Sequence, residues 1–436
     1  MAYRQRARTG GNGAGLRRHS LVKIGAGRRK IDLIYIDAGG GHRAAAGALA
    51  EVIRQQQRPW DLRQLCVQNL LDSIDFIRKS TGVAFQDVYN IMLRRGWTLG
   101  TAQLIPAMHM LIRLSHRAQV RVLEEHWNAS PPDMVVSLIP HYNRAFKDAL
   151  DLACPGVPLV TILTDIADYP PHFWIEPQEQ YVICGSERAT AQARSLALSE
   201  ARILRVSGMI LNPKFYAPPP PDRDAELARL GLRPGTPTGV VMFGGEGSLD
   251  LVKVARTLND SDLDIQLIVL CGRHEAAARQ LRGLAPRMPM FVEGFTDRIP
   301  HYMALADFFI GKAGPGSISE ALAMRLPVIV ERNVWTLAHE RYNADWIEEQ
   351  QVGIVVSSFS KIAGAVREML QPSRHERFRR RAEALRNFAV FEIPALLEEI
   401  LSKEIAAPPE FPAHERGRGI ANPAAREQKH FQAGAF

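Results

Sequence analysis

The chain has 436 residues, more than one ordinary hydrophobic core supports, which favours two domains with accessory segments. Apolar residues make up 46% and charged residues 23%, as in globular proteins, and the apolar runs fall short of the roughly 18 residues that span a bilayer. The net charge of +8 favours an anionic partner such as a membrane surface or nucleic acid. The four cysteines lie far apart without CxxC spacing, which argues against a zinc finger or a disulfide framework.

The first 30 residues contain no Asp or Glu and many Arg and Lys, which is typical of a disordered basic arm. Three interpretations of this arm remain open: a solvated tail, a contact with a membrane surface, and an Arg-rich targeting peptide. The arm lacks the apolar stretch of a secretory signal peptide.

Short apolar runs rich in β-branched residues alternate with helical patterns through both halves of the chain. Near-continuous apolar strands of this kind predict parallel sheets covered by helices on both faces. We therefore expect an α/β fold with two doubly wound, Rossmann-like domains facing a cleft. The expected strands are residues 31–37, 133–139, 158–164, 180–185 and 202–206 in the first half, and 238–244, 264–272, 290–294, 307–312 and 327–331 in the second.

A stiff connector should separate the two domains, because residues 212–224 contain four consecutive prolines. The loops that follow the carboxyl ends of the strands should then face the cleft. The expected division is a basic arm (1–30), a first Rossmann-like domain (31–207), a linker (208–236), a second Rossmann-like domain (237–385), a closing helix (386–404) and a tail (405–436).

Three consecutive glycines, Gly39, Gly40 and Gly41, follow the first expected strand and precede an alanine-rich helix. Glycines let a backbone approach a ligand closely, and the free N–H groups of a helix start favour an anion. The next residue is His42, where phosphate-binding loops usually carry Lys, Ser or Gly. The turn by itself leaves open whether it holds a phosphate or presents the histidine.

The segment 84–127 interrupts the alternation of strands and helices, and mixes Met, Leu, Ile and Trp with several arginines. Two interpretations remain open. One is a basic amphipathic helix on a membrane surface. The other is a pair of core-packing helices with a solvated Arg face.

Two glycine-rich turns follow strands in the second half, and together they are placed to flank a diphosphate. Such turns are also common in α/β proteins without a ligand there. Glu320, one turn into the second of the following helices, is placed to accept hydrogen bonds from ribose hydroxyls, or simply adds a favourable charge near the helix start. The first turn contains Gly244, Gly245 and Gly247, with Ser248 opening a helix, and the second contains Gly314 and Gly316, with Ser317 as N-cap.

The carboxylates of residues 260–264 are the one cluster with metal-like spacing in the sequence. They directly precede an expected strand, at the end of the sheet away from the cleft. We interpret them as a solvated loop and expect no metal ion.

These motifs occur together at a spacing that resembles a known family. Residues 292–347, including KAGPGS and HERYN, and the motifs at 37–49 and 390–401 carry the likeness, which covers about residues 31–403. The chain resembles the monogalactosyldiacylglycerol synthases and processive diacylglycerol glucosyltransferases. This family is related to the lipid-linked N-acetylglucosamine transferase of peptidoglycan synthesis.

The resemblance implies a GT-B type glycosyltransferase that binds a UDP-sugar in its second half and a lipid acceptor on its first half. The family often has Gln at the position of His339, which leaves the identity of the sugar open. By this resemblance Gly294 and Phe295 would flank uracil, Glu320 would bind ribose, the turns at 244–248 and 314–317 would hold the diphosphate, and His339, Glu340 and Asn343 would contact the hexose.

In the family picture the glycine turn faces the bond being made, with His42 on the acceptor side. A neutral imidazole has the pKa to accept the proton of the attacking hydroxyl. Asp165 follows a strand and is a rival base, in which case His42 would only orient the acceptor, and a purely structural His42 is the third possibility. His172 and Trp174 either line the acceptor cleft or pack in the core.

We therefore expect an inverting transferase that moves galactose or glucose from a UDP-hexose to diacylglycerol. We expect it in the cytoplasm, bound peripherally to the anionic surface of the inner face of the cell membrane. Oriented N–H groups would stabilise the departing UDP without a metal or another cofactor. The alternatives are an N-acetylglucosamine transferase acting on a polyprenyl-linked or lipid A-type acceptor, a UDP-sugar 2-epimerase and a non-catalytic nucleotide-sugar-binding protein. A nucleic-acid partner is disfavoured, because aromatic residues do not alternate with the basic ones.

Overall fold

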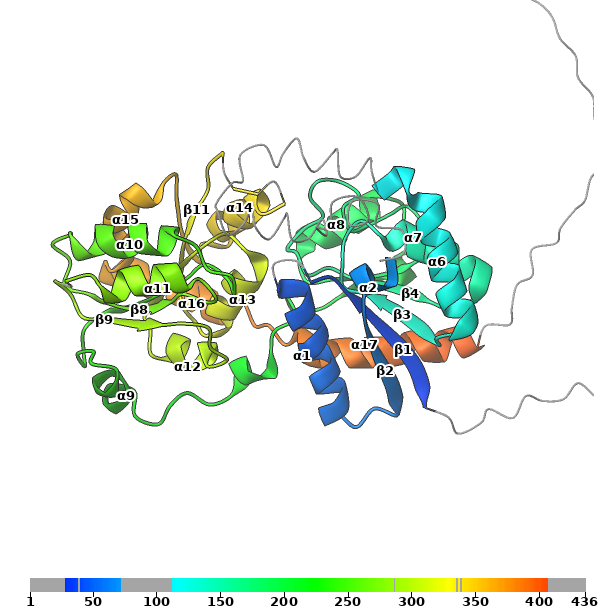
Figure 1. Ribbon diagram of the computed structural model, residues 1–436, viewed down its shortest axis with the longest axis horizontal. Helices are drawn as coiled ribbons and strands as arrows, with labels where there is room; N and C mark the ends of the chain where they lie inside the picture. The colour runs from blue at the N-terminus through cyan, green and yellow to red at the C-terminus, as the bar shows by residue number, and fades with distance from the viewer. Residues whose placement is uncertain are drawn as a thin grey trace, which may run out of the picture.

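A computed structural model describes residues 28–37, 40–71, 112–285, 287–334, 336–337 and 339–406. Figure 1 shows two α/β units side by side, and the helices labelled α1, α13 and α14 lie on their facing sides. Several expectations lie outside the described residues. These are the basic arm up to residue 27, Gly39, residues 84–111 of the basic apolar segment and the tail from residue 407.

The first sheet has six parallel strands in the order β2-β1-β3-β4-β5-β6. Apolar side chains on its two faces pack against helices and form the core of this unit. The strands are β1 (Arg29–Tyr35), β2 (Trp60–Cys66), β3 (Met134–Ser137), β4 (Leu159–Ile162), β5 (Tyr181–Cys184) and β6 (Ile203–Arg205).

The second sheet repeats this plan, with six parallel strands in the order β12-β11-β10-β7-β8-β9. It too is covered on both faces, so the expected doubly wound α/β class is confirmed. The strands are β7 (Thr238–Met242), β8 (Gln266–Leu270), β9 (Met290–Glu293), β10 (Phe308–Gly311), β11 (Val328–Glu331) and β12 (Gly353–Val356).

The ten strands expected from the sequence are all present: β1 begins and ends two residues earlier than expected, and the other nine are one to four residues shorter. Strands β2 and β12 were not expected. Both lie at a sheet edge, where each pairs with a single neighbour. Strand β2 therefore carries polar residues along its length, in place of the continuous apolar run of a central strand. Strand β12 is only four residues long.

Helices connect the strands, and within the described ranges short 3-10 helices lie in the loops. The α-helices are α1 (Gly41–Gln55), α2 (Val67–Leu71), α6 (His116–Ala129), α7 (Asn143–Ala153), α8 (Glu187–Ser195), α9 (Arg223–Arg229), α10 (Asp250–Asn259), α11 (Glu275–Arg282), α12 (Ile299–Ala304), α13 (Pro315–Ala323), α14 (Arg341–Gln350), α15 (Ile362–Met369), α16 (Pro372–Ala384) and α17 (Ala389–Ala406). The 3-10 helices are η2 (Glu200–Arg202), η3 (Pro213–Tyr216) and η4 (Phe359–Lys361).

Helix α6 covers most of the described part of the basic apolar segment, from His116 on. Its buried side chains include Leu123 and Trp127, whereas Arg117 and Arg121 are exposed. In this part the arrangement is that of a core-packing helix with a solvated Arg face. Among the described residues, no helix combines the length and the apolarity needed to cross a bilayer.

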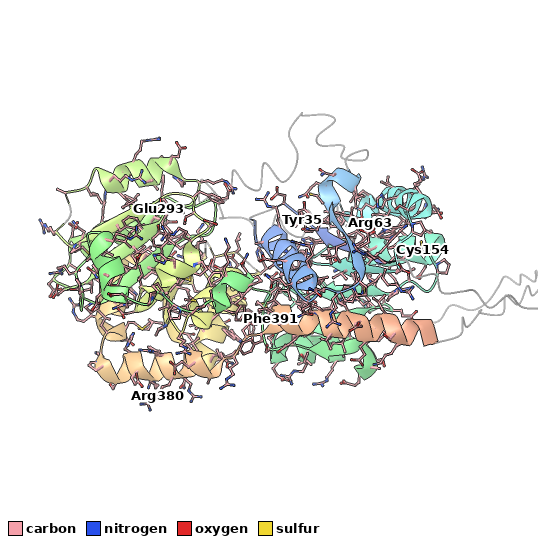
Figure 2. The ribbon with its side chains drawn as sticks, turned by 90° about the horizontal axis from the view of Figure 1, so that it is seen from below. Tyr35, Arg63, Cys154, Glu293, Arg380 and Phe391 are labelled. Carbon is pink, nitrogen blue, oxygen red and sulfur yellow. The ribbon has the colours of Figure 1, made fainter. Side chains whose placement is uncertain are left out.

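The last helix, α17, returns from the second unit to the first (Figure 1). Val390, Ile393 and Leu397 are fully buried in the core of the first unit, beside α1. Figure 2 places Phe391 where α17 passes between the units, and its ring lies 4.9 Å from that of Tyr216 in the linker. The linker and α17 thus join the two units along one side.

Each sheet has one point where its strand order reverses, and such points are where doubly wound folds bind ligands. In the first sheet this point lies between β1 and β3, and in the second between β7 and β10. The glycine-rich turns singled out from the sequence follow β1, β7 and β10. The topology therefore brings the two turns of the second half together.

Candidate active site

His42 lies in the first turn of α1, directly after β1. The helix begins at Gly41, and Gly40 caps it with a φ of 84°, a conformation that glycine adopts readily. The imidazole is half-buried, with its Nδ1 3.0 Å from Thr164 Oγ1 and its ring 5.8 Å from that of Trp174. The structure therefore presents this histidine at the reversal point of the first sheet.

The surroundings keep His42 neutral at physiological pH. Burial lowers the pKa of the imidazole below its usual 6.5, and nearby His339 lowers it further. Asp165 and the carbonyl group of Leu138 act in the opposite direction but do not reverse the shift. A neutral imidazole at this position is able to accept a proton.

Asp165 is the second candidate base, and it is 7% exposed. Its Oδ2 accepts a hydrogen bond of 2.8 Å from Trp174 Nε1, and its charge acts on both His42 and Glu340. Trp174 is fully buried, so its indole packs in the core and holds the carboxylate. The packing interpretation of Trp174 therefore applies, with an added role in orienting Asp165.

Asp168, which the sequence reasoning passed over, organises the loop that carries Asp165. The Asp168 carboxylate accepts backbone N–H bonds of 3.2 Å from His172 and 2.7 Å from Trp174. Burial raises its pKa to about 6, against the effect of these bonds. His172 has a φ of 62°, and its Nδ1 is buried without a hydrogen-bond partner among the described residues. The available signal was a second Asp in the sequence TDIAD, close after a strand.

The turn after β7 is built so tightly that glycine is required. Gly244 and Gly247 have φ of 75° and 71°. A Cβ on Gly247 would lie 2.2 Å from the carbonyl oxygen of Cys271, and Gly245 accepts a backbone bond of 2.9 Å from Arg273. This turn starts beside the one after β10, because Met242 pairs with Gly311 in the sheet.

Two expectations about helix starts are wrong. Helix α10 begins at Asp250, and Ser248 lies before it, where its Oγ is 3.0 Å from the Asp250 carboxylate. Helix α13 has Gly314 as N-cap, so Ser317 lies inside the first turn. Proline is favoured at the first helical position because its φ is already fixed near the helical value, which explains why α13 starts at Pro315.

The start of α13 leaves room for a ligand. A Cβ on Gly316 would have no atom within 4 Å. Glu320, farther along the same helix, is half-buried, and no hydrogen bond or ion pair joins it to another described residue. Burial raises the pKa of this carboxyl group to about 7. Such a side chain is placed to gain hydrogen bonds from a ligand hydroxyl.

A cavity of about 800 Å³ opens beside the turn after β7, which contributes Glu246 to its lining. It is lined by Gly294 and Phe295 after β9 and by charged residues that include Arg273 and Arg279. The Phe295 ring is 60% exposed, and the Arg273 guanidinium lies 4.1 Å from its centre. An exposed aromatic ring in a basic pocket is a suitable wall for a planar ligand with attached phosphates.

The segment after β11 contacts the first half of the chain. The ring of His339 stacks on that of Phe173 at 5.7 Å, and its Nδ1 is buried without a partner among the described residues. The pKa of Glu340 is raised, mainly by burial and in part by the charge of Asp165. His339 and Lys312 act in the opposite direction. Asn343 is buried, and its amide donates a hydrogen bond of 2.8 Å to the carbonyl oxygen of Ala313. This bond ties α14 to the turn before α13.

Groups from both halves thus come close together: His42 and Asp165 from the first, and His339 and Glu340 from the second. Lys312, which was not singled out as a site residue, belongs to the same neighbourhood, because it acts on Glu340 and Asp250. In contrast, Asp262 and Asp264 of the acidic loop pair with Arg367 and Arg233. Among the described residues, no three His, Cys, Asp or Glu side chains are grouped to hold a metal.

Comparison with solved structures identifies the fold. The chain aligns with MurG of Acinetobacter baumannii at a TM-score of 0.55 and 11% identity, covering 85% of this chain and 99% of that one. It aligns with the calicheamicin glycosyltransferase CalG4 at 0.55 and 16% identity, covering 87% of this chain and 100% of that one. The two-sheet architecture is therefore the GT-B fold of glycosyltransferases.

Comparison of sequences identifies the relatives. Residues 239–393 match the glycosyltransferase family 28 C-terminal domain. The chain is 27% identical to the probable monogalactosyldiacylglycerol synthase of Nicotiana tabacum, with 80% of this chain and 66% of that protein covered. It is 27% identical to monogalactosyldiacylglycerol synthase 1 of Arabidopsis thaliana, with 87% and 72% covered. The chain is thus a GT-B-fold relative of the monogalactosyldiacylglycerol synthases, and its second half carries a glycosyltransferase family 28 C-terminal domain.

Proposed function

We propose that this protein transfers a hexose, galactose or glucose, from a UDP-sugar to diacylglycerol or a related lipid. The observation that carries the proposal is the close approach of His42 and Asp165 to His339 and Glu340. A proton acceptor on one side and polar groups suited to sugar hydroxyls on the other are what a transfer between two substrates requires. The names of the relatives favour diacylglycerol as the acceptor.

The donor belongs in the second half. Uracil lies between Gly294 and Phe295 in the basic cavity, and Glu320 accepts hydrogen bonds from the ribose. The turn at 244–248 and the start of α13 direct N–H groups at the diphosphate. His339 and Glu340 contact the hexose, and Asn343 supports the site from behind by holding the turn before α13.

The acceptor hydroxyl approaches from the first half, beside His42 and the glycine turn. His42 accepts the hydroxyl proton while the oxygen attacks the anomeric carbon of the donor. A carbon–oxygen bond forms, the bond between the sugar and UDP breaks, and the configuration inverts. Asp165 stabilises the resulting imidazolium electrostatically. If Asp165 is itself the base, His42 only orients the hydroxyl. Substitution of His42 distinguishes a base from an orienting group.

The departing UDP carries the developing charge, and oriented backbone N–H groups stabilise it without a metal. Lys312, whose charge already acts on Glu340, adds a positive group in this neighbourhood. We therefore propose a metal-independent transferase, so that activity should persist in EDTA. Restoration of a lost activity by magnesium or manganese would contradict this part of the proposal.

The test is UDP release in detergent micelles containing EDTA, measured without an acceptor, with diacylglycerol, and with a polyprenyl-linked or lipid A-type acceptor. UDP-galactose, UDP-glucose and UDP-N-acetylglucosamine serve as donors in parallel, and the glycolipid is identified by mass spectrometry. We expect acceptor-dependent release of UDP from one of the first two donors. Release only with a polyprenyl-linked or lipid A-type acceptor would overturn the choice of diacylglycerol, and tight UDP binding without any transfer would indicate a non-catalytic protein.

A further inference from the structure

Three side chains from the two halves of the chain form one cluster at the cleft. Tyr169 and Arg188 belong to the first half, and Tyr342 belongs to α14 of the second. The rings of Tyr169 and Tyr342 lie 5.3 Å apart, centre to centre. The Arg188 guanidinium lies 5.6 Å from the centre of the Tyr169 ring and 5.8 Å from that of Tyr342. A single cation thus contacts aromatic rings on both sides.

Each member of the cluster is also held on its own side. Arg188 Nε donates a bond of 3.0 Å to the Tyr169 hydroxyl. The Tyr342 hydroxyl donates a hydrogen bond of 3.1 Å to Glu349, about two turns farther along α14. Burial, with a further effect of Glu349, raises the pKa of Tyr342 to about 12, so the phenol stays protonated. These bonds fix the three groups in the geometry that the contact between the halves needs.

On the side of the first half, the cluster connects to the loop that bears Asp165. Tyr169 directly follows Asp168, whose carboxylate holds the backbone of the residues up to Trp174, and Trp174 holds Asp165. Gln192, on the same helix as Arg188, exchanges two bonds of 2.9 Å with the backbone of Asp168. A displacement of Arg188 or Tyr169 would therefore reach the loop of the candidate base.

On the side of the second half, the cluster connects to the residues proposed to contact the hexose. Tyr342 lies between Glu340 and Asn343 in the chain, and Asn343 anchors this segment to Ala313. The stack of His339 on Phe173 is a second contact between the same two segments. The cluster therefore joins the donor-sugar segment to the loop that positions Asp165.

We propose that Tyr342, Arg188 and Tyr169 form an interdomain latch of positioning residues, which sets the distance between the donor sugar and the acceptor-side base. This inference rests on the proposed function, because it assigns the latch to the same transfer step. The latch touches neither the sugar nor the attacking hydroxyl. It acts through geometry, and misplacement of reacting groups by about 1 Å can lower a rate by roughly 10²-fold.

The test uses the full-length chain with Tyr342→Ala, Arg188→Ala and their combination. We expect each single variant to lower kcat by about tenfold or more, as a misplaced base or sugar should. The affinity for UDP should change less than about twofold, because the UDP site is built from the second half alone. The double variant should be no worse than the poorer single one, since both remove the same latch. Tyr342→Phe keeps the ring and should retain most of the activity.

Arg202→Ala is the matched control. Arg202 lies 4.9 Å from the Tyr181 ring, but both residues belong to the first half, so its loss should leave kcat unchanged. Small-angle X-ray scattering at saturating UDP adds a readout that needs no turnover. The radius of gyration should increase in Tyr342→Ala and Arg188→Ala, and remain at the wild-type value in Tyr342→Phe and Arg202→Ala.

Wild-type kcat and radius of gyration in both alanine variants would overturn the latch. A Tyr342→Phe variant as impaired as Tyr342→Ala would also overturn it, because the effect would then come from the bond to Glu349. If the fold-loss of kcat in the double variant equals the product of the two single losses, the two side chains act separately. That result would also overturn the latch. If the wild-type protein transfers no sugar but the alanine variants expand, the proposed function fails and the latch remains.

Discussion

At the scale of single residues, the cleft contains groups whose protonation is set by burial. His42 has a lowered pKa and stays neutral at physiological pH, whereas Glu320 and Glu340 have raised values. Perturbed titratable groups of this kind gather at sites where chemistry or binding takes place. In all three groups burial favours the neutral form, which lowers the pKa of an imidazole and raises that of a carboxyl group.

The first prediction concerns His42. If it is the general base, His42→Ala should lower kcat by roughly 10²–10⁴-fold, the usual contribution of a positioned proton acceptor. The affinity for UDP should change little, because the donor site is built from the second half. Because the pKa of His42 is lowered, wild-type kcat should already be at its plateau at neutral pH and decline only in acid. Steady-state kinetics and isothermal titration calorimetry measure the two quantities.

The variant His42→Gln separates proton transfer from orientation. Glutamine can hydrogen-bond to an acceptor hydroxyl but cannot take its proton at neutral pH. Turnover near the wild-type value in this variant would make His42 an orienting group and assign the base to Asp165. A loss of UDP binding in His42→Ala would instead mean that the glycine turn reaches the phosphates.

The second prediction uses the raised pKa of Glu320. Its folded-state pKa of about 7 lies above the usual 4.5, so the folded protein binds this proton more tightly than the unfolded chain does. The ionised carboxylate therefore lowers stability above about pH 7, and the effect disappears below about pH 4.5. Glu320→Gln should raise the Tm of the ligand-free protein at pH 8, by about 1–3 °C, and leave it unchanged at pH 4.5.

The same variant should bind the donor less well. An amide replaces a carboxylate that accepts bonds from the ribose, and bonds to charged groups contribute about 1.5–3 kcal/mol. The donor KM should rise about tenfold or more with a smaller change in kcat, because the bond is made in both the ground state and the transition state. A higher Tm combined with an unchanged donor KM would remove Glu320 from the nucleotide site.

At the scale of elements, α17 stabilises the first unit although it follows the second unit in the chain. Its apolar face packs on the first unit, although the family 28 domain to which its first residues belong lies in the second. The 3.6-residue spacing of Val390, Ile393, Leu397 and Leu401 is that of a helix with one buried face. The helix therefore acts as a part of the first core.

The third prediction follows from this packing. Leu397→Ala removes a fully buried side chain and should lower the free energy of unfolding by about 2–5 kcal/mol. Hydrogen exchange followed by mass spectrometry should show faster exchange in β1 and α1, with little change in β7 and β10. Glu399→Ala, on the exposed face of the same helix, should change stability by less than about 0.5 kcal/mol. Faster exchange confined to the second unit would contradict this account.

At the scale of the whole molecule, we expect the surface of the first half to bind the membrane. Arg113, Arg117 and Arg121 are exposed at and before α6, and Leu114 beside them is 72% exposed. Basic residues near an exposed apolar side chain suit an anionic headgroup surface. Attachment to a membrane is a proposal that a direct binding measurement can test.

The fourth prediction is that binding to vesicles rises with anionic lipid content and falls partly, but not wholly, at high salt. Salt screens the contribution of arginines but affects apolar insertion much less. The double variant Arg117→Glu/Arg121→Glu should weaken co-sedimentation with anionic vesicles. Arg380→Glu, an equally exposed arginine on α16 of the second half, is the control and should bind as the wild type. Equal binding of wild-type protein to neutral and anionic vesicles would exclude the electrostatic part.

The sequence alone was sufficient for the fold class, for all the central strands and for two of the four edge strands. Central strands of doubly wound sheets are buried on both faces and leave a continuous apolar signature, whereas edge strands such as β2 do not. Local chemistry also predicted the tight turn at Gly244 and Gly247. From the sequence, the start of α13 was expected too late in the chain, with Ser317 as the cap. The helix begins at Pro315, because proline is favoured at the first helical position.

The arrangement of the cleft depended on the tertiary structure. His42 and Asp165 are far apart in the chain, and no periodicity relates them to Glu340. Only the order of strands brings the loops after β1 and β4 to the same edge of a sheet. Asp168 also required the structure, because a loop-forming carboxylate has no sequence pattern that distinguishes it from a solvated one.

Apolar periodicity and glycine-rich turns are local properties of the chain. For this reason the sequence by itself determined two parallel α/β units and the turns that follow their strands. Contacts between the units are not local. The pairing of Tyr342 with Arg188, and of His339 with Phe173, depends on how two separately built surfaces dock. Docking follows from the summed shape and charge of both surfaces, so only the tertiary structure decided which side chains meet across the cleft.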